Sequence, residues 1–159
     1  MFREMRRSRQ MLSIEETVAV MKRCTNGVLA CIGDGDYPYA VPLSYVYYNN
    51  KIYFHFSKTG HKIDAILKCP KVSFCVIDED TVVSEKYTSY YRSAIAFGKT
   101  RIVEGDERLE AFKALVEKYS GDRPEGEKQR TINECTKAYI IAIDIEHMTG
   151  KQAREYVKS

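Results

Sequence analysis

A short polar stretch between two apolar segments carries the residues best suited to chemistry in this sequence. Residues 57–62 are Ser-Lys-Thr-Gly-His-Lys, after an aromatic run and before apolar residues at helical spacing. A helix that begins here would present unpaired backbone N–H groups and a partial positive charge. With two hydroxyls, two ammonium groups and an imidazole beside it, this corner is suited to bind an anion, most simply a phosphate.

Two predicted strands lead into this corner. Residues 39–48 and 51–56 are rich in aromatic and β-branched side chains, and Asn49-Asn50 between them favours a tight turn because asparagine tolerates positive φ. Pro42 lies inside the first strand. Because proline cannot donate a ladder hydrogen bond, we expect this position at a sheet edge, a bulge or a break in pairing. Such a break leaves backbone groups free for a ligand.

The remaining segments predict short strands with helices between and around them. Ser13 and Glu16 form a capping box that starts a helix ending before residue 26. We expect residues 81–89 to be a flexible loop or an interface segment, and residues 122–130 to be a surface loop. The last strand is predicted at 138–145, and residues 148–159 are predicted to be a polar tail.

These elements amount to about six strands and three helices, and the alternation of a doubly wound βαβ fold is absent. We therefore expect one domain over residues 1–159, mainly β with α, built as a roughly six-stranded, mostly antiparallel barrel with flanking helices that cover its ends.

Composition limits the classes of partner. Lysine and arginine number 25 against 22 aspartates and glutamates, a net charge of +3, which is too balanced to indicate nucleic-acid binding. Five cysteines without a C-x-x-C pair favour reduced thiols and a cytoplasmic protein. The longest apolar runs are about five or six residues, too short to span a membrane. The basic N-terminal segment of residues 1–10 is either solvated or folded over an anionic ligand or a partner subunit.

Common catalytic machinery is missing from the sequence. It contains no G-x-G-x-x-G, G-x-x-x-x-G-K-[ST], G-x-S-x-G or H-E-x-x-H pattern. The only histidines are His55, His61 and His147, and their spacing does not predict a metal site. A phosphate site beside an aromatic strand pair remains, and this combination suits a planar phosphorylated cofactor.

At this point the sequence resembles a known family. Segments 39–45, 52–57 with Gly60 and Lys62, and 92–99 resemble the FMN-binding split-barrel proteins, and most of all the nitroimidazole-resistance (Nim) group of pyridoxamine 5′-phosphate oxidase-like flavoproteins. The resemblance covers about residues 5–148 and implies a homodimer with FMN at the subunit interface. A true pyridoxamine 5′-phosphate oxidase carries a C-terminal basic substrate motif, which is absent after Ile145 and argues against that activity.

The resemblance also implies roles for residues of the two strands and the corner. Pro42, Leu43 and Ser44 are expected to line the isoalloxazine ring. Three side chains are expected to hold the phosphate by charge-assisted hydrogen bonds, namely Ser57, His61 and Lys62.

Further roles are implied for residues of later segments and for one histidine. Tyr91, Arg92 and Ser93 of the other subunit are expected to approach the flavin, and His147 is expected to contribute after the last strand. His55 is a candidate proton donor or substrate contact, and a hydrogen-bonded histidine at a strand end is the structural alternative.

Two classes of function follow. The first is an FMN-dependent oxidoreductase that passes electrons from NADH or NADPH to a small organic acceptor such as a nitroaromatic. The alternative is a non-catalytic flavin- or haem-binding split-barrel protein. A weaker hypothesis is nucleic-acid contact through the arginines of residues 1–10. It predicts an affinity for nucleic acid that falls steeply as the salt concentration rises.

Overall fold

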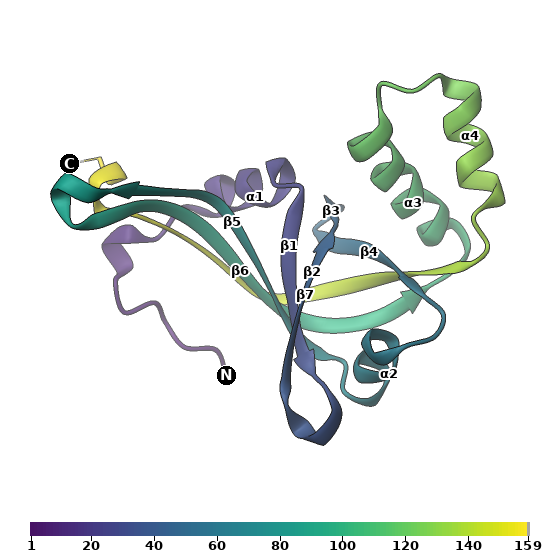
Figure 1. The fold of residues 1–159 in the computed structure, drawn as a ribbon, viewed down its shortest axis with the longest axis horizontal. Helices are drawn as coiled ribbons and strands as arrows, with labels where there is room; N and C mark the ends of the chain where they lie inside the picture. Colours follow the sequence, from purple (N-terminus) through teal and green to yellow (C-terminus); the bar gives the residue numbers. More distant parts are fainter. Residues whose placement is uncertain (159) are drawn as a thin grey trace.

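Seven strands join in one antiparallel sheet in the computed structural model, which describes residues 1–158 (Figure 1). The strands are β1 (Asn26–Ile32), β2 (Pro38–Ser44), β3 (Val46–Tyr48), β4 (Lys51–Ser57), β5 (Lys71–Val83), β6 (Thr88–Val103) and β7 (Ala138–Gln152). Their hydrogen-bonded order is β2-β1-β5-β6-β7-β4-β3, so β2 and β3 are the two edges.

The two edge strands are neighbours in sequence, because Tyr45 alone separates Ser44 of β2 from Val46 of β3. Both edges of the sheet therefore lie next to each other at Tyr45. The sheet curls into a barrel, and its hydrogen-bond ladder stays open between β2 and β3. The predicted antiparallel split barrel is confirmed. The strand count is seven rather than six, because the segment predicted as one strand over 39–48 divides at Tyr45.

Four α-helices flank the sheet in the described residues: α1 (Ile14–Arg23), α2 (His61–Lys68), α3 (Gly105–Ser120) and α4 (Glu125–Glu134). The predicted capping box starts α1, since the Glu16 N–H donates to Ser13 Oγ at 3.1 Å and the Ser13 N–H donates to Glu16 Oε2 at 2.9 Å. The surface loop predicted over 122–130 is wrong from residue 125 onward. There α4 forms and packs against α3 as a helical hairpin at one end of the molecule (Figure 1).

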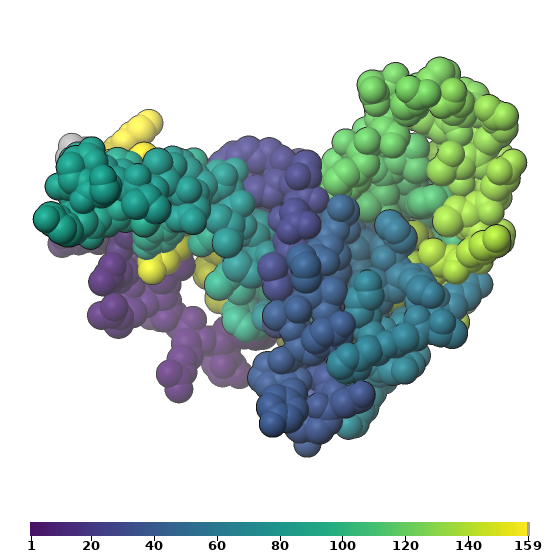
Figure 2. Space-filling view, in the orientation of Figure 1, coloured from purple at the N-terminus to yellow at the C-terminus, as the bar shows by residue number. Residues whose placement is uncertain are grey.

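β5 and β6 extend beyond the barrel as a long hairpin, here called the arm, which comprises residues 79–92. Residues 81–83 pair with residues 88–90, and a 3₁₀ turn at Ser84–Lys86 joins them, so most of the loop predicted over 81–89 is strand. Figure 2 shows the arm projecting from the body on the side opposite the α3–α4 hairpin.

β7 also runs further than predicted. Gln152 pairs with Arg92 of β6, and Gly150 pairs with Ala94. The polar tail predicted from residue 148 is therefore wrong as far as Gln152. Pairing with β6 satisfies the backbone of this segment, and local composition does not reveal that partner.

The main core lies on the inner face of the sheet. Ile52, Phe54 and Phe56 of β4 alternate toward this core, and α1 covers it with Val20 and Met21. The intervening Tyr53 points to a second cluster, under Ala111 and Leu115 of α3. Among the described helices, none is long and apolar enough to cross a lipid bilayer.

Candidate functional site

The start of α2 has the geometry of an anion site. Gly60 is its N-cap with φ 119°, and no side chain caps the helix. A Cβ built at Gly60 would meet nothing within 4 Å, so the space before the first turn is open. The first N–H groups of a helix have no intrahelical acceptor, and they are therefore available to a ligand at this corner.

Two predicted phosphate ligands border this open space. Ser57 is exposed at the end of β4, and its Oγ accepts the N–H of Thr59 at 3.5 Å. Lys62 is exposed on the first turn of α2, and its Nζ lies 5.1 Å from the centre of the Phe56 ring. Within residues 1–158 the Lys62 ammonium forms no ion pair, so it can turn toward an anion.

His61 is engaged elsewhere. Its ring stacks on Tyr39 with centroids 4.2 Å apart and planes 11° apart, and its Nε2 accepts the backbone N–H of Asp34 at 3.2 Å. His61 thus holds α2 against the β1–β2 hairpin, and its Nε2 is already engaged with Asp34.

β2 is one of the two edge strands of the sheet, as expected for a strand that contains Pro42. Pro42 pairs with Val28 of β1, and no strand in the described residues pairs with the other edge of β2. Pro42 and Ser44 are exposed, whereas Leu43 packs against the main core. A ligand on this side would meet the side chains of Pro42 and Ser44 and the free backbone groups of the strand.

The corner and β2 adjoin one another. The His61–Tyr39 stack joins the first residue of α2 to β2, and Tyr39 lies three residues, or about 10 Å along the strand, before Pro42. The structure therefore places the corner beside the start of β2, whereas Pro42 lies further along that strand and, three residues after Tyr39, on its opposite face.

The residues predicted to approach from a second subunit lie on the arm or at its base, away from α2 in the same protomer (Figure 1). Arg92 Nη1 lies 3.3 Å from Asp78 Oδ2 and 3.5 Å from Glu79 Oε2. The Tyr91 hydroxyl accepts a hydrogen bond from Gln10 Nε2 at 3.2 Å, and Ser93 pairs with Lys151. Within one protomer these three residues do not join the corner.

Asp78 is the centre of an ion-pair cluster beside the bulge in β5. Its carboxylate accepts two hydrogen bonds from Arg23, with Nε to Oδ1 at 2.7 Å and Nη2 to Oδ2 at 2.5 Å, besides the contact with Arg92. The hydrogen bonds from Arg23, and then from Arg92, hold the pKa of Asp78 below its ordinary value. This cluster ties α1 to the base of the arm.

The two remaining histidines lie on different strands. His55 is exposed on β4, on the same side of the strand as Ser57 and about 7 Å from it along the chain. His147 lies on β7 opposite Phe97 of β6, and its ring stacks on Phe2 with centroids 4.9 Å apart and planes 5° apart. His55 is therefore near the corner, and His147 is on a separate surface.

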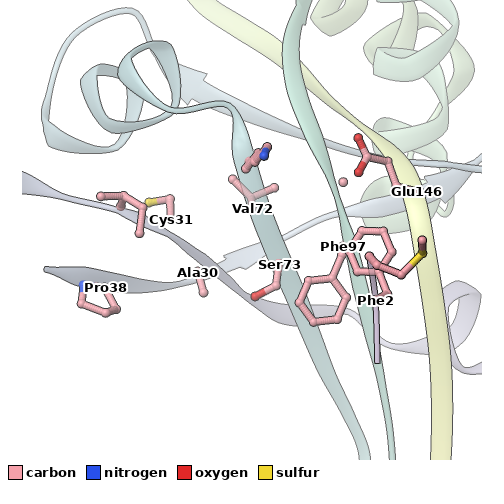
Figure 3. Close-up of a pocket in the computed structure, with 12 residues that line it drawn as sticks. Phe2, Ala30, Cys31, Pro38, Val72, Ser73, Phe97 and Glu146 are labelled. Atoms are coloured by element: carbon pink, nitrogen blue, oxygen red, sulfur yellow. The ribbon is translucent and has the colours of Figure 1, made fainter. Parts of the chain in front are cut away.

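That surface, here called the outer face, is the side of β1, β5, β6 and β7 that points away from the main core. It holds a cavity of about 460 Å³ (Figure 3). The cavity is lined by Met1, Phe2, Ala30, Cys31, Ile32, Pro38, Lys71, Val72, Ser73, Phe97, Gly98 and Glu146. Phe97 and Gly98 belong to segment 92–99, which carries the family resemblance, and Met1 and Phe2 belong to the basic N-terminal residues 1–10, but a cavity between these segments was not predicted from the sequence. A usable signal was present in β1, where inward Leu29 and outward Ala30 and Ile32 are all apolar, as in strands covered on both faces.

Comparison with known proteins identifies the family. A model described as pyridoxamine 5′-phosphate oxidase matches residues 13–152. The chain belongs to this family. No curated protein matches the sequence.

Three solved structures share the fold of this pyridoxamine 5′-phosphate oxidase family member. Conserved hypothetical protein Rv2991 from Mycobacterium tuberculosis has a TM-score of 0.81 at 21% identity, over 98% of this chain and 94% of that one. A candidate 5-nitroimidazole antibiotic resistance protein from Bacteroides thetaiotaomicron has a TM-score of 0.73 at 18% identity, over 89% and 86%. The FAD and heme binding protein from Mycobacterium smegmatis has a TM-score of 0.72 at 16% identity, over 94% and 76%.

Proposed function

We propose that this chain binds FMN across β2 and the start of α2, and passes electrons from NADH or NADPH to a small organic acceptor such as a nitroaromatic. The observation that carries the proposal is the uncapped N-terminus of α2 next to the bare edge of β2, in a member of the pyridoxamine 5′-phosphate oxidase family. Structural neighbours include flavin-binding proteins, which supports a flavin as the ligand.

The residues present fit the two parts of the cofactor. Lys62, Ser57 and the first N–H groups of α2 would hold the phosphate, because an ammonium, a hydroxyl and a helix dipole all favour an anion. Pro42 and Ser44 would line the ring, and the unpaired backbone of β2 would meet its polar edge. A bound flavin supplies the two-electron chemistry that these side chains lack.

His55 is the proposed proton donor or substrate contact. Its imidazole is exposed two residues before Ser57, within reach of a ligand whose phosphate occupies the corner. Histidine exchanges protons readily near neutral pH, so it can supply a proton to an acceptor that gains electrons.

We also propose a homodimer. Apolar side chains are unusually exposed on the outer face, with Ile77 64% exposed, Ile95 39% and Phe97 38%, and a second copy would cover them. In such a dimer the partner would supply Tyr91, Arg92 and Ser93 to the flavin. Sedimentation equilibrium tests this point: a mass of twice 18.3 kDa supports the dimer, and a monomer at all concentrations contradicts it.

A second candidate function is non-catalytic binding of a flavin or a haem. The fold shared with the FAD and heme binding protein from Mycobacterium smegmatis supports this second candidate. This alternative predicts a coloured protein that does not consume NADH or NADPH in the presence of any acceptor.

The deciding experiment is an absorption spectrum of the freshly purified protein, followed by chromatography of the ligand released on denaturation. Oxidised-flavin bands with release of FMN, together with acceptor-dependent consumption of NADH or NADPH, support the proposal. A protein that stays colourless after incubation with FMN contradicts it. A haem band, or flavin without turnover, favours the second candidate.

A further inference from the structure

Both ends of the chain reach the arm and enclose a small polar pocket there. The pocket has a volume of about 170 Å³ and lies between the N-terminal 3₁₀ turn (Ser8–Gln10), strand β6 and the C-terminal 3₁₀ turn (Arg154–Tyr156). Figure 1 shows the C-terminal turn beside the arm. The lining residues that carry charges or hydroxyl groups are Arg7, Thr88, Ser89, Tyr91, Arg154 and Glu155.

Hydrogen bonds between the arm and the two chain ends fix the pocket. Gln10 lines it and is only 8% exposed, and its Nε2 donates to the Tyr91 hydroxyl at 3.2 Å and to the carbonyl oxygen of Gln152 at 2.9 Å. The Ala153 N–H donates to the carbonyl oxygen of Tyr91 at 2.8 Å. The Tyr91 hydroxyl accepts from Gln10 and has no acceptor of its own within residues 1–158, so its proton is available to a ligand.

The charges around the pocket favour an anion. Arg7 is exposed and forms no ion pair within residues 1–158, whereas Arg154 Nε lies 3.3 Å from Glu155 Oε1. Two guanidinium groups and one carboxylate leave an excess of positive charge among the lining residues. Lys151 adds to this excess, because its Nζ lies 5.5 Å from the centre of the Tyr91 ring.

The first ten residues carry the whole net charge of the chain. Four arginines and one glutamate give this segment a charge of +3, which equals the net charge of the full sequence. Residues 11–159 are therefore neutral as a group. Arg7 is the one of these four arginines that lines the pocket, so the other three provide matched comparisons.

We infer that this pocket binds a phosphate group carried by a small ligand. Guanidinium groups match the geometry of phosphate oxygens, and the hydroxyl groups of Thr88, Ser89 and Tyr91 supply further donors. The volume of about 170 Å³ is below the ~300 Å³ of sites that hold whole drug-sized ligands, so the pocket suits one oxyanion group rather than a ring system.

The pocket is compatible with the proposed homodimer. It is not lined by Ile77, Ile95 or Phe97, the exposed apolar residues that a second copy would cover. Tyr91 is the lining residue that the proposed dimer also places beside the flavin of the partner subunit, so the pocket would open next to that flavin.

This position deepens the proposed function with respect to the electron donor. NADPH carries a phosphate group that NADH lacks, and a phosphate pocket beside the flavin would favour NADPH. The choice of donor rests on the proposed function, whereas phosphate binding by the pocket does not require a flavin.

Calorimetric titration with inorganic phosphate tests the pocket without relying on turnover. The purified full-length protein is first saturated with FMN, so that the corner is filled, in about 0.15 M salt to screen long-range charge effects. Arg7→Gln and Arg154→Gln should each weaken phosphate binding by about 3–5-fold, as for partly exposed ion pairs. Glu155→Gln should strengthen it by a similar factor, because this variant removes the opposing carboxylate.

Two control variants separate the pocket from other sources of positive charge. Arg9→Gln removes the same charge as Arg7→Gln from the same exposed segment, but Arg9 does not line the pocket, so phosphate binding should stay unchanged. Lys62→Ala alters the corner and should also leave phosphate binding by the pocket unchanged. If FMN does not bind, the series is repeated in the Lys62→Ala protein, which removes the contribution of the corner.

Failure of this inference and failure of the proposed function give different results. The inference is overturned, even when FMN is bound, if millimolar phosphate does not bind or if wild type, Arg7→Gln and Arg154→Gln bind it equally. It is also overturned if Arg9→Gln loses as much affinity as Arg7→Gln, because the basic segment then attracts anions without a site. A flavin-free protein that shows the expected pattern retains the phosphate site and loses the proposed function.

Titration with NADPH and with NADH identifies the source of the phosphate. If wild type binds NADPH more tightly than NADH and Arg7→Gln removes the difference, the ligand is the electron donor. If the two nucleotides bind equally while the pattern with inorganic phosphate holds, the phosphate site is supported and its ligand is a different phosphate ester.

Discussion

The hydroxyl of Tyr119 accepts the backbone N–H of Tyr45 at 2.9 Å and lies 2.7 Å from the carbonyl oxygen of the same residue. Tyr45 separates β2 from β3, so both of its backbone groups lie outside the sheet ladder. The last turn of α3 therefore supplies a hydrogen-bond partner for the backbone groups of Tyr45, which no strand within residues 1–158 pairs with. The contact also anchors the end of β2, where Pro42 and Ser44 lie.

Removing the Tyr119 hydroxyl should destabilise the junction between β2 and β3. Tyr119→Phe leaves the N–H of buried Tyr45 without its acceptor, and we expect the free energy of unfolding to fall by about 1–3 kcal/mol. Urea denaturation followed by circular dichroism measures this change. Tyr37→Phe, which alters an exposed tyrosine, is the control and should have little effect. Equal stability of Tyr119→Phe and wild type would show that water replaces the hydroxyl.

The proposed phosphate corner makes a charge-specific prediction. Lys62→Ala should weaken FMN binding by about 1.5–3 kcal/mol, because it removes a charge-assisted hydrogen bond to the phosphate. Fluorescence titration of the flavin-free protein with FMN measures the loss. Lys68→Ala is the matched control, since Lys68 is an exposed lysine at the other end of α2. If both variants bind FMN like wild type, Lys62 is not a phosphate ligand.

Two glycine substitutions should change stability in opposite directions. Gly98→Ala forces a Cβ to within 2.3 Å of a backbone oxygen at the bulge between β6 and β7, and we expect a loss of about 1–3 kcal/mol. Gly126→Ala lies in α4 with nothing within 4 Å of the new Cβ, and we expect a gain of about 0.5–1 kcal/mol from helix propensity. Thermal unfolding of both variants, compared with wild type, checks the two signs.

Stability at acidic pH should depend on Glu107. Hydrogen bonds from Arg101, at 2.7 Å to each carboxylate oxygen, and from the Tyr53 hydroxyl lower the pKa of Glu107 to about 2, from an ordinary 4.5. Because the folded state favours the charged carboxylate, the stabilisation is complete above pH 4.5 and is lost as the pH falls from 4.5 toward 2.

Urea denaturation at a series of pH values tests this dependence. Glu107→Gln should show a smaller decline in the free energy of unfolding between pH 4.5 and 2 than wild type. Arg101→Gln should reduce the decline similarly, because it removes the cause of the lowered pKa. If the free energy of unfolding of all three proteins falls by the same amount between pH 4.5 and 2, the lowered pKa of Glu107 is not the cause of the decline.

The segments with strong local signals could be predicted from the sequence. The capping box of Ser13 and Glu16, the Asn49-Asn50 turn with φ of 49° and 60°, and the edge position of Pro42 all follow from the chemistry of single residues. The antiparallel barrel and the corner at the start of α2 followed from the order of such signals, and the family resemblance implied that the barrel is split.

What local signals could not reveal is which segments pair over long distances. Charged residues 78–80 and polar residues 148–152 have the composition of loops, yet they are strand because β6 satisfies their backbone groups. The cluster of Asp78 with Arg23 and Arg92 joins residues 55 and 14 positions apart. The cavity under Phe2 needs the chain terminus, β1, β5, β6 and β7 together. The sequence alone determined the local conformations and the residue types of the corner, whereas tertiary pairing decided which side chains meet. The free energy of a long-range contact depends on partners that no local pattern of residues contains.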